Sequence, residues 1–450
     1  MPLRPFFPLL LVLVFGAPAL AEESAKAVEP QPTEKPAQSV LPLEDLRVFT
    51  KAYEHIRSSY IHEIDDKTLL EHAIRGMLDQ LDPHSSYLDA SSFDDLQVHT
   101  TGEFGGLGIE VGMEDGFVKV ISPIDDTPAQ RAGIEAGDLI IKIDDTTLKG
   151  LSLNDAVSRM RGPKGSKIVL TIVREGQEQP FDVTLERDTI KVRSVRTEMM
   201  DTSFLYLRIA QFQVDTGQDV KKALNDNLKK HALKGVILDL RNNPGGVLQA
   251  SVEVADAFLD GGKVVYTEGR MNHSNLNYDA EPGDLIQGLP LVVLINEGSA
   301  SASEIVAGAL QDHRRALVIG TRSFGKGSVQ TVIPITDDKA VKLTTALYFT
   351  PNGRSIQAQG IEPDLVVERA ELTTVKSRGR ITEAQLAGHL DNAKGGKDIK
   401  TQEREQERDL NTANLQGRDN QLYEALNLLK GLTFFKAAAQ PKKEAAQMAH

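Results

Sequence analysis

The sequence predicts an α/β fold, in which a mixed or parallel sheet is covered by helices, and two observations carry this prediction. Short, nearly continuous apolar runs occur at 235–240, 291–295 and 316–319. Segments with helical periodicity lie between or beside them, at 220–231 and 304–313. Apolar strands that alternate with helices are typical of a largely parallel sheet that is buried on both faces.

The length and composition bound what such a protein can do. The chain has 450 residues, which is enough for two or three domains. Its formal charge is 51 − 64 = −13, and no segment carries a dense cluster of Lys and Arg, so nucleic-acid binding is not expected. Cysteine is absent, which excludes disulfides, thiol nucleophiles and thiolate metal sites. We expect neither a cofactor nor a metal ion.

The first residues have the anatomy of a secretory signal peptide. Arg4 is the only charge before the apolar run 6–15, and Ala19-Leu20-Ala21 supplies an A-x-A cleavage site. An uncleaved membrane anchor is the alternative, although the run is short for a membrane span. We therefore expect residues 1–21 to be the signal peptide of an exported, periplasmic protein. Residues 22–40 carry three prolines and almost no large apolar side chain, which predicts a flexible linker.

Two amphipathic helices are predicted in an N-terminal helical region, 41–96. Spacings of three and four on the first helix relate Leu46, Phe49, Tyr53, Ile56 and Tyr60. The second carries Leu70, Ile74, Met77 and Leu81 on one face. It stops at Asp82-Pro83, because the residue before a proline disfavours the helical region. Each apolar face either packs on its own domain or recruits a second subunit.

Residues 97–186 are predicted to form a separate small module of short strands and turns. The strand-like runs are 118–121, 168–173 and 181–185, and the helical segments are 129–132 and 153–160. Beyond the α/β region, the chain turns polar and charge-dense at 366–420. A C-terminal region, 371–450, then ends in an apolar helix with Leu422, Leu426 and Leu429, followed by Leu432, Phe434 and Phe435.

A serine-rich turn at 298–304 is the first candidate for chemistry. It follows a buried strand and opens a helix, where parallel sheets commonly place ligands and where free N–H groups can stabilise an oxyanion. Ser301-x-x-Glu304 is equally a capping box, which is the purely structural alternative. No G-x-S-x-G elbow occurs, and no histidine is marked as a base; His313 reads as a residue at the end of the helix.

Two further turns follow buried strands, at 241–246 and 322–330. The strand before the second turn ends at Gly320, and Gly320-x4-Gly325-Lys326 resembles a phosphate-binding loop, but Gly327 replaces the Ser or Thr that would hold magnesium. We therefore set the phosphate-loop interpretation aside. Three turns at the ends of three buried strands can converge on one crevice.

The same turns carry a family resemblance. SASASE at 299–304, FGKGSVQ at 324–330 and LDLRNNPGG at 238–246 resemble the carboxyl-terminal processing, or tail-specific, peptidases. LDPHSSYL at 81–88 and YFTPNGRSIQAQGIEPD at 348–364 fit the same family. The resemblance runs from about residue 41 to residue 370 and implies a serine peptidase core at 187–370.

The resemblance implies a role for particular residues. In that family the middle serine of the turn is the nucleophile and a lysine 25 positions later is its base; here 326 − 301 = 25 selects Ser301 and Lys326. Gln330 takes the place of the supporting glutamine. A lysine of ordinary pKa, about 10.4, is protonated near neutral pH and cannot accept the serine proton, whereas a desolvated lysine can.

The resemblance also implies the oxyanion hole and the domain that selects substrates. Ala302 and a turn glycine, Gly245 or Gly246, would donate to the oxyanion. The module at 97–186 is similar to a PDZ domain, with Gly106-Leu107-Gly108-Ile109 as its carboxylate-binding loop. Arg161 lies where related enzymes place an arginine that touches the active-site region and gates activity; a solvated loop arginine is the alternative.

These expectations describe an exported Ser–Lys endopeptidase that recognises protein substrates through their C-termini and processes or degrades envelope proteins. The alternative is a non-catalytic PDZ scaffold that retains a degenerate peptidase fold. An activator or adaptor protein is a further expected partner. We also expect a homo-oligomer that is assembled partly through its N- and C-terminal helices.

Overall fold

The structure analysed is a computed structural model. It describes residues 42–114, 116–124, 126–370, 386–388, 390 and 419–439. The predicted signal peptide, the predicted linker and most of the polar stretch before the last helix lie outside the described residues. The chain divides into two compact units, Met1–Glu71 and His72–His450, which are taken one at a time below.

The first unit contains the first predicted helix and the start of the second. Helix α1 spans Leu43–Ser59, and α2, which continues into the second unit, spans Asp66–Asp79. Asp65 caps α2, because its carboxylate accepts hydrogen bonds from the backbone N–H and the hydroxyl of Thr68 at 2.9 and 2.6 Å. The Tyr53 hydroxyl donates to Asp66 at 2.8 Å and so joins the two helices. Both predicted helices are confirmed.

A short strand and a helix follow α2. Strand β1 spans Ser86–Leu88, and α3 spans Ala90–Thr101. Asp89 caps the start of α3, and Gly102, with φ 72°, ends it in the left-handed conformation that glycine adopts without strain. The predicted domain boundary at 96/97 therefore falls inside a helix, which is a correction to the sequence-based division.

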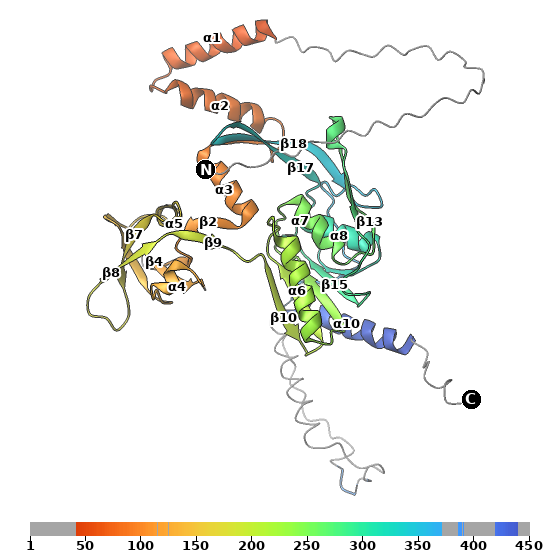
Figure 1. Cartoon of the computed structure of the whole chain (residues 1–450). Coiled ribbons are helices and arrows are strands. Elements are labelled where there is room, and N and C mark those ends of the chain that lie inside the picture. Colours follow the sequence, from red (N-terminus) through yellow and green to blue (C-terminus); the bar gives the residue numbers. More distant parts are fainter. Residues whose placement is uncertain are drawn as a thin grey trace, which may run out of the picture. The chain divides into compact units, whose positions relative to one another are not determined.

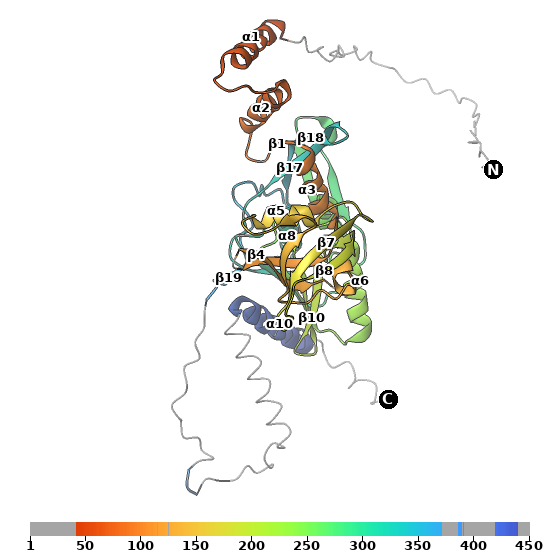
Figure 2. The same cartoon turned by 90° about the vertical axis from the view of Figure 1, so that its left-hand side faces the viewer.

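The inserted module is an antiparallel β-structure with its own core. Its strands are β3 (Ile109–Glu114), β4 (Phe117–Pro123), β5 (Leu139–Ile143), β6 (Thr146–Thr147), β7 (Lys167–Val173) and β8 (Phe181–Glu186), and its helices are α4 (Pro128–Arg131) and α5 (Leu153–Met160). Val120, Ile140, Leu170 and Ile172 are fully buried in it. All three predicted strands and both predicted helical segments are present (Figure 2).

A two-stranded neck closes the insertion. Strand β2 (Glu103–Gly106) pairs antiparallel with β9 (Asp188–Lys191), on the two sides of the module in the sequence. The chain therefore leaves the main fold and returns to it at adjacent points. The sequence boundary at 186 omitted this second neck strand.

The main sheet matches the predicted parallel core. Strand β10 (Val195–Met200) forms an antiparallel edge, and the parallel strands are β11 (Phe204–Ile209), β12 (Gly235–Asp239), β15 (Leu291–Ile295), β16 (Leu317–Gly320) and β19 (Leu365–Val366). Every residue of β12 and β15 is buried. This explains why both strands read as continuous apolar runs.

Helices cover both faces of this sheet (Figure 1). The larger core contains residues of α6 (Thr216–Lys230), α7 (Leu248–Asp256) and α8 (Ala302–Asp312). The opposite face packs against α10, Asn420–Ala439. Successive side chains of β12 point to opposite faces of the sheet, so Val236 packs in the larger core and Ile237 packs in the cluster beneath α10.

The position of α10 corrects one prediction. The C-terminal helix is expected at a subunit contact, but its residues Leu426 and Leu429 are 5% and 0% exposed because they pack on the sheet of their own chain. Leu422 is partly buried against the same cluster. The exposed apolar side chains of α10 are those nearer its end, Leu432, Phe434 and Phe435.

A second sheet was not predicted. It is built on the long strand β18 (Lys339–Phe349), which pairs with β1, β13 (Gly262–Gly269) and β17 (Ser328–Thr336), while β14 (Asn277–Ala280) extends it and η1 (Asn272–Ser274) follows β13. Its strands mix polar and apolar side chains, so they carry no continuous apolar signal. Among the residues that the structure describes, no helix has the length and apolar character to cross a bilayer.

Candidate active site

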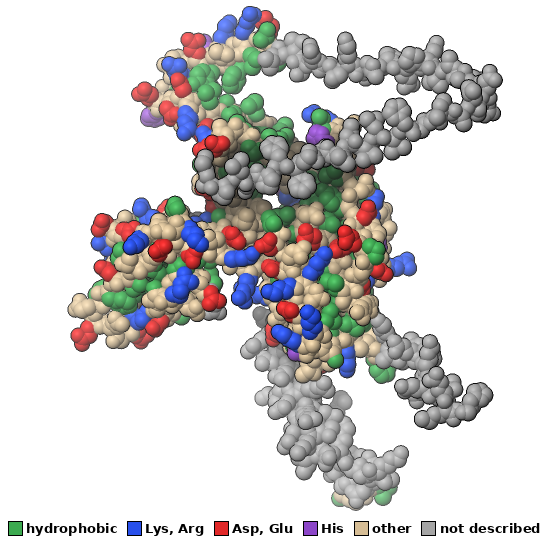
Figure 3. Space-filling model, in the orientation of Figure 1, with side chains coloured by type: hydrophobic (Ala, Val, Ile, Leu, Met, Phe, Trp, Pro, Cys, Tyr) green, Lys and Arg blue, Asp and Glu red, His purple; other side chains and the backbone are tan. Residues whose placement is uncertain are grey.

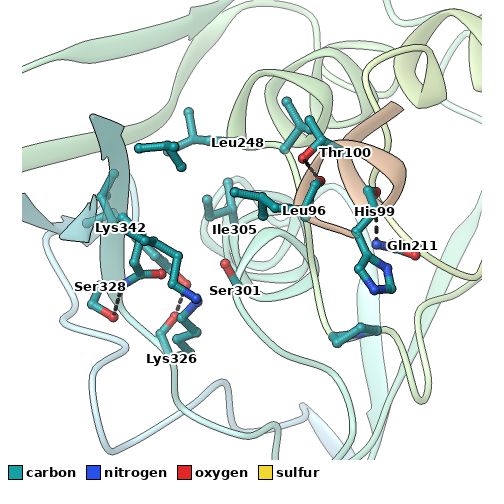
Figure 4. A pocket seen from close by; sticks show the side chains of 17 residues that line it. Leu96, His99, Thr100, Gln211, Leu248, Ser301, Ile305, Lys326, Ser328 and Lys342 are labelled. Atoms are coloured by element: carbon teal, nitrogen blue, oxygen red, sulfur yellow. Dashed lines mark hydrogen bonds between the residues drawn. The ribbon is translucent and has the colours of Figure 1, made fainter. Parts of the chain in front are cut away.

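The three predicted turns meet at one cavity of about 360 Å³. Ser301, Lys326, Pro244 and Gly246 all line it. They follow β15, β16 and β12, which are neighbours in the parallel sheet, so their carboxyl ends lie at one edge. Figure 4 shows Ser301 near the centre, with Lys326 and Lys342 on one side. The expected convergence is confirmed.

Ser301 occupies a strained backbone position at the start of α8. Its φ is 57° and its ψ is −113°, in a region where side-chain-bearing residues cost about 1–3 kcal/mol. The neighbouring serines are fully buried and hold the turn: the Ser299 hydroxyl donates to the Leu240 carbonyl at 2.8 Å, and the Ser303 hydroxyl donates to the Asn243 carbonyl at 3.0 Å. Of the three, Ser301 alone lines the cavity.

Two backbone N–H groups are free to receive an oxyanion. The Gly245 N–H already donates to the Asn243 side chain at 2.9 Å. The N–H groups of Gly246 and Ala302 have no acceptor among the described residues. A Cβ on Gly245 would lie 2.7 Å from the Ser301 Cβ, so this glycine permits close approach of the two turns. The geometry favours Gly246 over Gly245 as the donor beside Ala302.

The carboxylate of Glu304 joins the serine turn to the lysine loop. The side chain is fully buried and accepts four hydrogen bonds. The donors are the backbone N–H groups of Ser301 (2.7 Å), Gly325 (2.7 Å) and Lys326 (2.9 Å) and the hydroxyl of Ser323 (2.6 Å). Burial raises the pKa of Glu304, and the donors oppose that rise. The spacing of Ser301 and Glu304 marks Glu304 only as a capping residue and does not reveal this link.

The environment of Lys326 favours the neutral amine. Burial lowers the pKa of Lys326, the positive charge of Lys342 lowers it further, and the charge of Glu304 acts in the opposite direction. Lys342 lies on β18 opposite Val332 of β17, and both line the cavity. Lys342 was not predicted as a site residue, because no local motif marks a lysine on a strand of mixed polar and apolar residues.

Tyr348 lines the same cavity as Ser301 and Lys326. It is 1% exposed, and its hydroxyl donates to the Lys326 carbonyl. Burial raises the pKa of Tyr348, and the charge of Glu304 raises it further, while a hydrogen bond with Ser301 opposes the rise. The phenol therefore keeps its proton near neutral pH and remains a donor.

Gln330 lies where the resemblance implied, in the same cavity as Ser301 and Lys326. Its side-chain Nε2 donates to the hydroxyls of Ser328 at 2.9 Å and Thr344 at 3.3 Å. The amide therefore has a fixed orientation within the wall that β17 and β18 form.

The rest of the cavity wall is largely apolar. Leu96 of α3, Leu248 of α7 and Ile305 of α8 line it, and His99 of α3 adds a polar edge (Figure 4). Helix α3 lies far from the peptidase turns in sequence, so local motifs could not predict its contribution. Such a wall suits an apolar side chain of a bound chain.

The predicted carboxylate-binding loop is anchored through its carbonyl groups. The Leu107 carbonyl accepts from the Ala129 N–H at 2.9 Å, and the Gly108 carbonyl accepts from the Ile124 N–H at 2.8 Å. The N–H groups of Leu107 and Gly108 have no acceptor within the described part of the chain. Gly108 has φ 77° in this turn between Gly106 and Ile109. Free, adjacent N–H groups are what capture of a terminal carboxylate requires.

Arg161 does not line the cavity itself. Its guanidinium donates to Asp95 of α3 at 3.0 Å and lies 5.2 Å from the centre of the Phe104 ring. Helix α3 also carries Leu96 and His99, which line the cavity. Arg161 therefore contacts the helix that forms part of the cavity wall, but not the cavity itself.

The fold and this site define a class of protein: a serine peptidase with an α/β core and an inserted PDZ module. Comparison with known families agrees. Residues 203–367 match Peptidase family S41, 105–185 match the PDZ domain, and 13–92 match the activating protease CtpB N-terminal domain.

Similar proteins place the chain within that class. It is 52% identical over 346 residues to the carboxy-terminal-processing protease of Bartonella bacilliformis, covering 76% of this chain and 80% of the relative. It is 39% identical over 322 residues to the carboxy-terminal processing protease CtpA of Bacillus subtilis, covering 71% and 68%. A solved photosystem II D1 C-terminal processing protease aligns with 30% identity and a TM-score of 0.43, covering 71% of this chain and 92% of that one.

The chain therefore belongs to the carboxy-terminal processing proteases of peptidase family S41 and is a serine endopeptidase with a PDZ domain. This membership favours the peptidase over the alternative of a non-catalytic scaffold.

Proposed function

We propose that the protein is an exported endopeptidase that cleaves envelope proteins with Ser301 as nucleophile, Lys326 as general base and Gln330 as the residue that orients the base. One observation carries the assignment of residues: the buried Glu304 ties the backbone of Ser301 to that of Lys326 beside two free N–H groups. The signal-peptide pattern of residues 1–21 supports export to the periplasm.

The proposed reaction passes through an acyl-enzyme. The Ser301 hydroxyl attacks the scissile carbonyl and transfers its proton to the neutral Lys326 amine. The N–H groups of Gly246 and Ala302 stabilise the oxyanion of the tetrahedral intermediate. The Lys326 ammonium then protonates the departing amine as the C–N bond breaks. Water, deprotonated by the same amine, hydrolyses the ester and returns the serine hydroxyl.

The PDZ module supplies substrate choice in this proposal. A substrate C-terminus adds as a strand beside β3, and its carboxylate accepts from the loop Gly106–Ile109, whose free N–H groups are those of Leu107 and Gly108. The test compares hydrolysis of one tailed protein with a free terminal carboxylate and with a terminal amide. Wild type should prefer the carboxylate, and Ser301→Ala should cleave neither. Equal cleavage of the two forms would contradict recognition through the C-terminus.

Arg161→Ala is expected to lower turnover more than it weakens binding of a C-terminal peptide. The variant loses the ion pair with Asp95 and so loosens α3, whereas the carboxylate-binding loop stays intact. Steady-state kinetics and peptide titration by fluorescence anisotropy check this result. Arg131→Ala, which removes an exposed ion pair with Asp188 elsewhere on the module, is the matched control. Unchanged turnover in Arg161→Ala would remove Arg161 from gating.

A homo-oligomer remains part of the proposal. Helix α1 buries none of its residues, and Leu46, Phe49 and Ile56 are exposed along it. Figure 3 shows hydrophobic side chains on the surface of this helix. Large apolar faces of this kind commonly mark contacts between proteins. An activator or adaptor protein is the second kind of partner that such a face accommodates.

The exposed end of α10 provides a test of assembly that spares the fold. Replacing Phe434 and Phe435 by serine should lower the subunit number measured by light scattering, because both rings are exposed. The melting temperature should stay within a few degrees, since Leu426 and Leu429 keep the helix on its sheet. An unchanged subunit number would remove the C-terminal helix from the interface.

A further inference from the structure

The turn that follows α2 is organised around one carboxylate. Asp82 accepts hydrogen bonds from the backbone N–H groups of His84 (2.8 Å) and Ser85 (2.9 Å) and from the Ser85 hydroxyl (2.7 Å). A fourth donor, the Thr344 hydroxyl of β18, lies at 3.1 Å, although it is 262 positions away in the sequence. Burial opposes ionisation, but these donors hold the pKa of Asp82 below its ordinary value. At neutral pH this carboxylate is therefore an acceptor only.

The acceptor character of Asp82 fixes the proton of Thr344. A hydroxyl has one proton to donate, and Asp82 offers no proton in return, so the Thr344 hydroxyl must donate to Asp82. Ser85 strengthens this arrangement, because its own hydroxyl donates to Asp82 and accepts the Thr344 N–H at 3.1 Å. Toward Gln330, Thr344 therefore presents only a lone pair.

The lone pair of Thr344 in turn fixes the amide of Gln330. Only the Nε2 end of the amide can donate to it, at 3.3 Å, and the same nitrogen donates to Ser328 at 2.9 Å. The Oε1 end has no donor among the residues described, and the Lys326 amine has no hydrogen-bond partner among them either. Both side chains line one cavity.

We propose that Asp82 is a positioning residue of the peptidase: through Thr344 it orients the Gln330 amide so that Oε1 accepts an N–H of the Lys326 amine. The amine lone pair is then left for the proton of Ser301. In the reversed orientation, the Gln330 NH₂ group would donate to that lone pair and occupy the base. The inference rests on the proposed role of Lys326.

Other charges around Lys326 must be separated from this effect. The ionisable groups that face it are Glu304 of α8, Lys342 and Tyr348 of β18, and His84 of the turn. Burial and the charge of Lys326 lower the pKa of His84. Asp82→Asn removes a negative charge as well as an acceptor, whereas Thr344→Val removes the relay with no change of charge. If both variants lower kcat to a similar extent, the cause is the loss of the hydrogen-bond chain Asp82–Thr344–Gln330 and not the loss of the Asp82 charge.

The experiment measures kcat, KM and the pH profile of kcat/KM on a peptide with a free C-terminus. Asp82→Asn and Thr344→Val should each lower kcat roughly 10- to 100-fold, as part of what a positioned base contributes, with little change in KM. The acidic limb of the profile should move to lower pH in Asp82→Asn, because an N–H donated to the amine disfavours its protonation. Thr344→Ser, which restores the hydroxyl, should recover most of the kcat that Thr344→Val loses.

Two controls separate positioning from simple loss of structure. Asp65→Asn alters a carboxylate with the same local role, since it caps α2 through Thr68, and should leave kcat unchanged. In a Gln330→Ala background, Asp82→Asn should lower kcat no further, because its effect passes through the amide. Full additivity of the two substitutions, or an unchanged kcat in folded Thr344→Val, would overturn the inference.

The result is distinguishable from failure of the proposed function. If Lys326→Met abolishes hydrolysis while the Asp82 and Thr344 variants turn over normally, Lys326 is still supported as the base, but Asp82 has no positioning role. If Lys326→Met remains active, the proposed base itself is wrong.

Discussion

Ser301→Ala is expected to abolish peptide hydrolysis, lowering kcat/KM by about 10⁴-fold or more, as loss of a nucleophile does in other serine peptidases. The fold should persist, because the buried Glu304 carboxylate binds the backbone N–H of Ser301, which the substitution keeps. Circular dichroism and the melting temperature should match those of wild type. Assay of a tailed protein substrate by gel and by mass spectrometry measures the loss.

The flanking serines are matched controls for this prediction. Ser299→Ala and Ser303→Ala should retain activity, because neither hydroxyl lines the cavity. Each should lower the free energy of unfolding by about 1–3 kcal/mol, since a buried carbonyl acceptor loses its donor. An inactive Ser299→Ala beside an active Ser301→Ala would refute the assignment of the nucleophile.

Lys326→Met should likewise abolish hydrolysis, because methionine keeps the bulk of the side chain and removes the amine. In wild type, kcat/KM should rise with pH as the amine loses its proton. Since burial and Lys342 lower the pKa of Lys326, this rise should occur below the ordinary lysine pKa of about 10.4. The active form is the neutral one, so activity is lost as the pH falls through the lowered pKa.

Substitution of Lys342 tests the electrostatic cause. Lys342→Met removes a positive charge that disfavours protonation of Lys326, so the acidic limb of the pH profile should move to higher pH. Lys342→Arg keeps the charge and should leave the limb near its wild-type position. A limb that stays in place in Lys342→Met, or that moves equally in both variants, would contradict this origin of the shift.

The parallel sheet and its turns could be predicted from the sequence, because β12 and β15 are buried on both faces and read as unbroken apolar runs. The hairpin of β17 and β18 could not, since its strands mix polar and apolar residues with neither a continuous apolar run nor a regular alternation. That hairpin supplies Lys342 and Gln330 to the cavity wall, and of these two only Gln330 was marked by the family resemblance.

Contacts between distant segments account for the remaining misses. The apolar stripe of α10 was visible, but only the structure shows that Leu426 and Leu429 cover the sheet of their own chain. The choice between Gly245 and Gly246 depends on the Asn243 side chain, which occupies the first N–H. Glu304 satisfies a capping box and also binds the lysine loop, and sequence spacing reveals only the first of these roles.

The position of the acyl group formed during turnover is the most direct test of the proposed chemistry. Wild-type enzyme is quenched with acid while it hydrolyses an activated ester of an apolar peptide, digested and mapped by mass spectrometry. We predict an acyl group on Ser301, absent in Ser301→Ala and not accumulated in Lys326→Met. An acyl group on Ser299 or Ser303, or formation at the wild-type rate in Lys326→Met, would contradict the Ser301–Lys326 assignment.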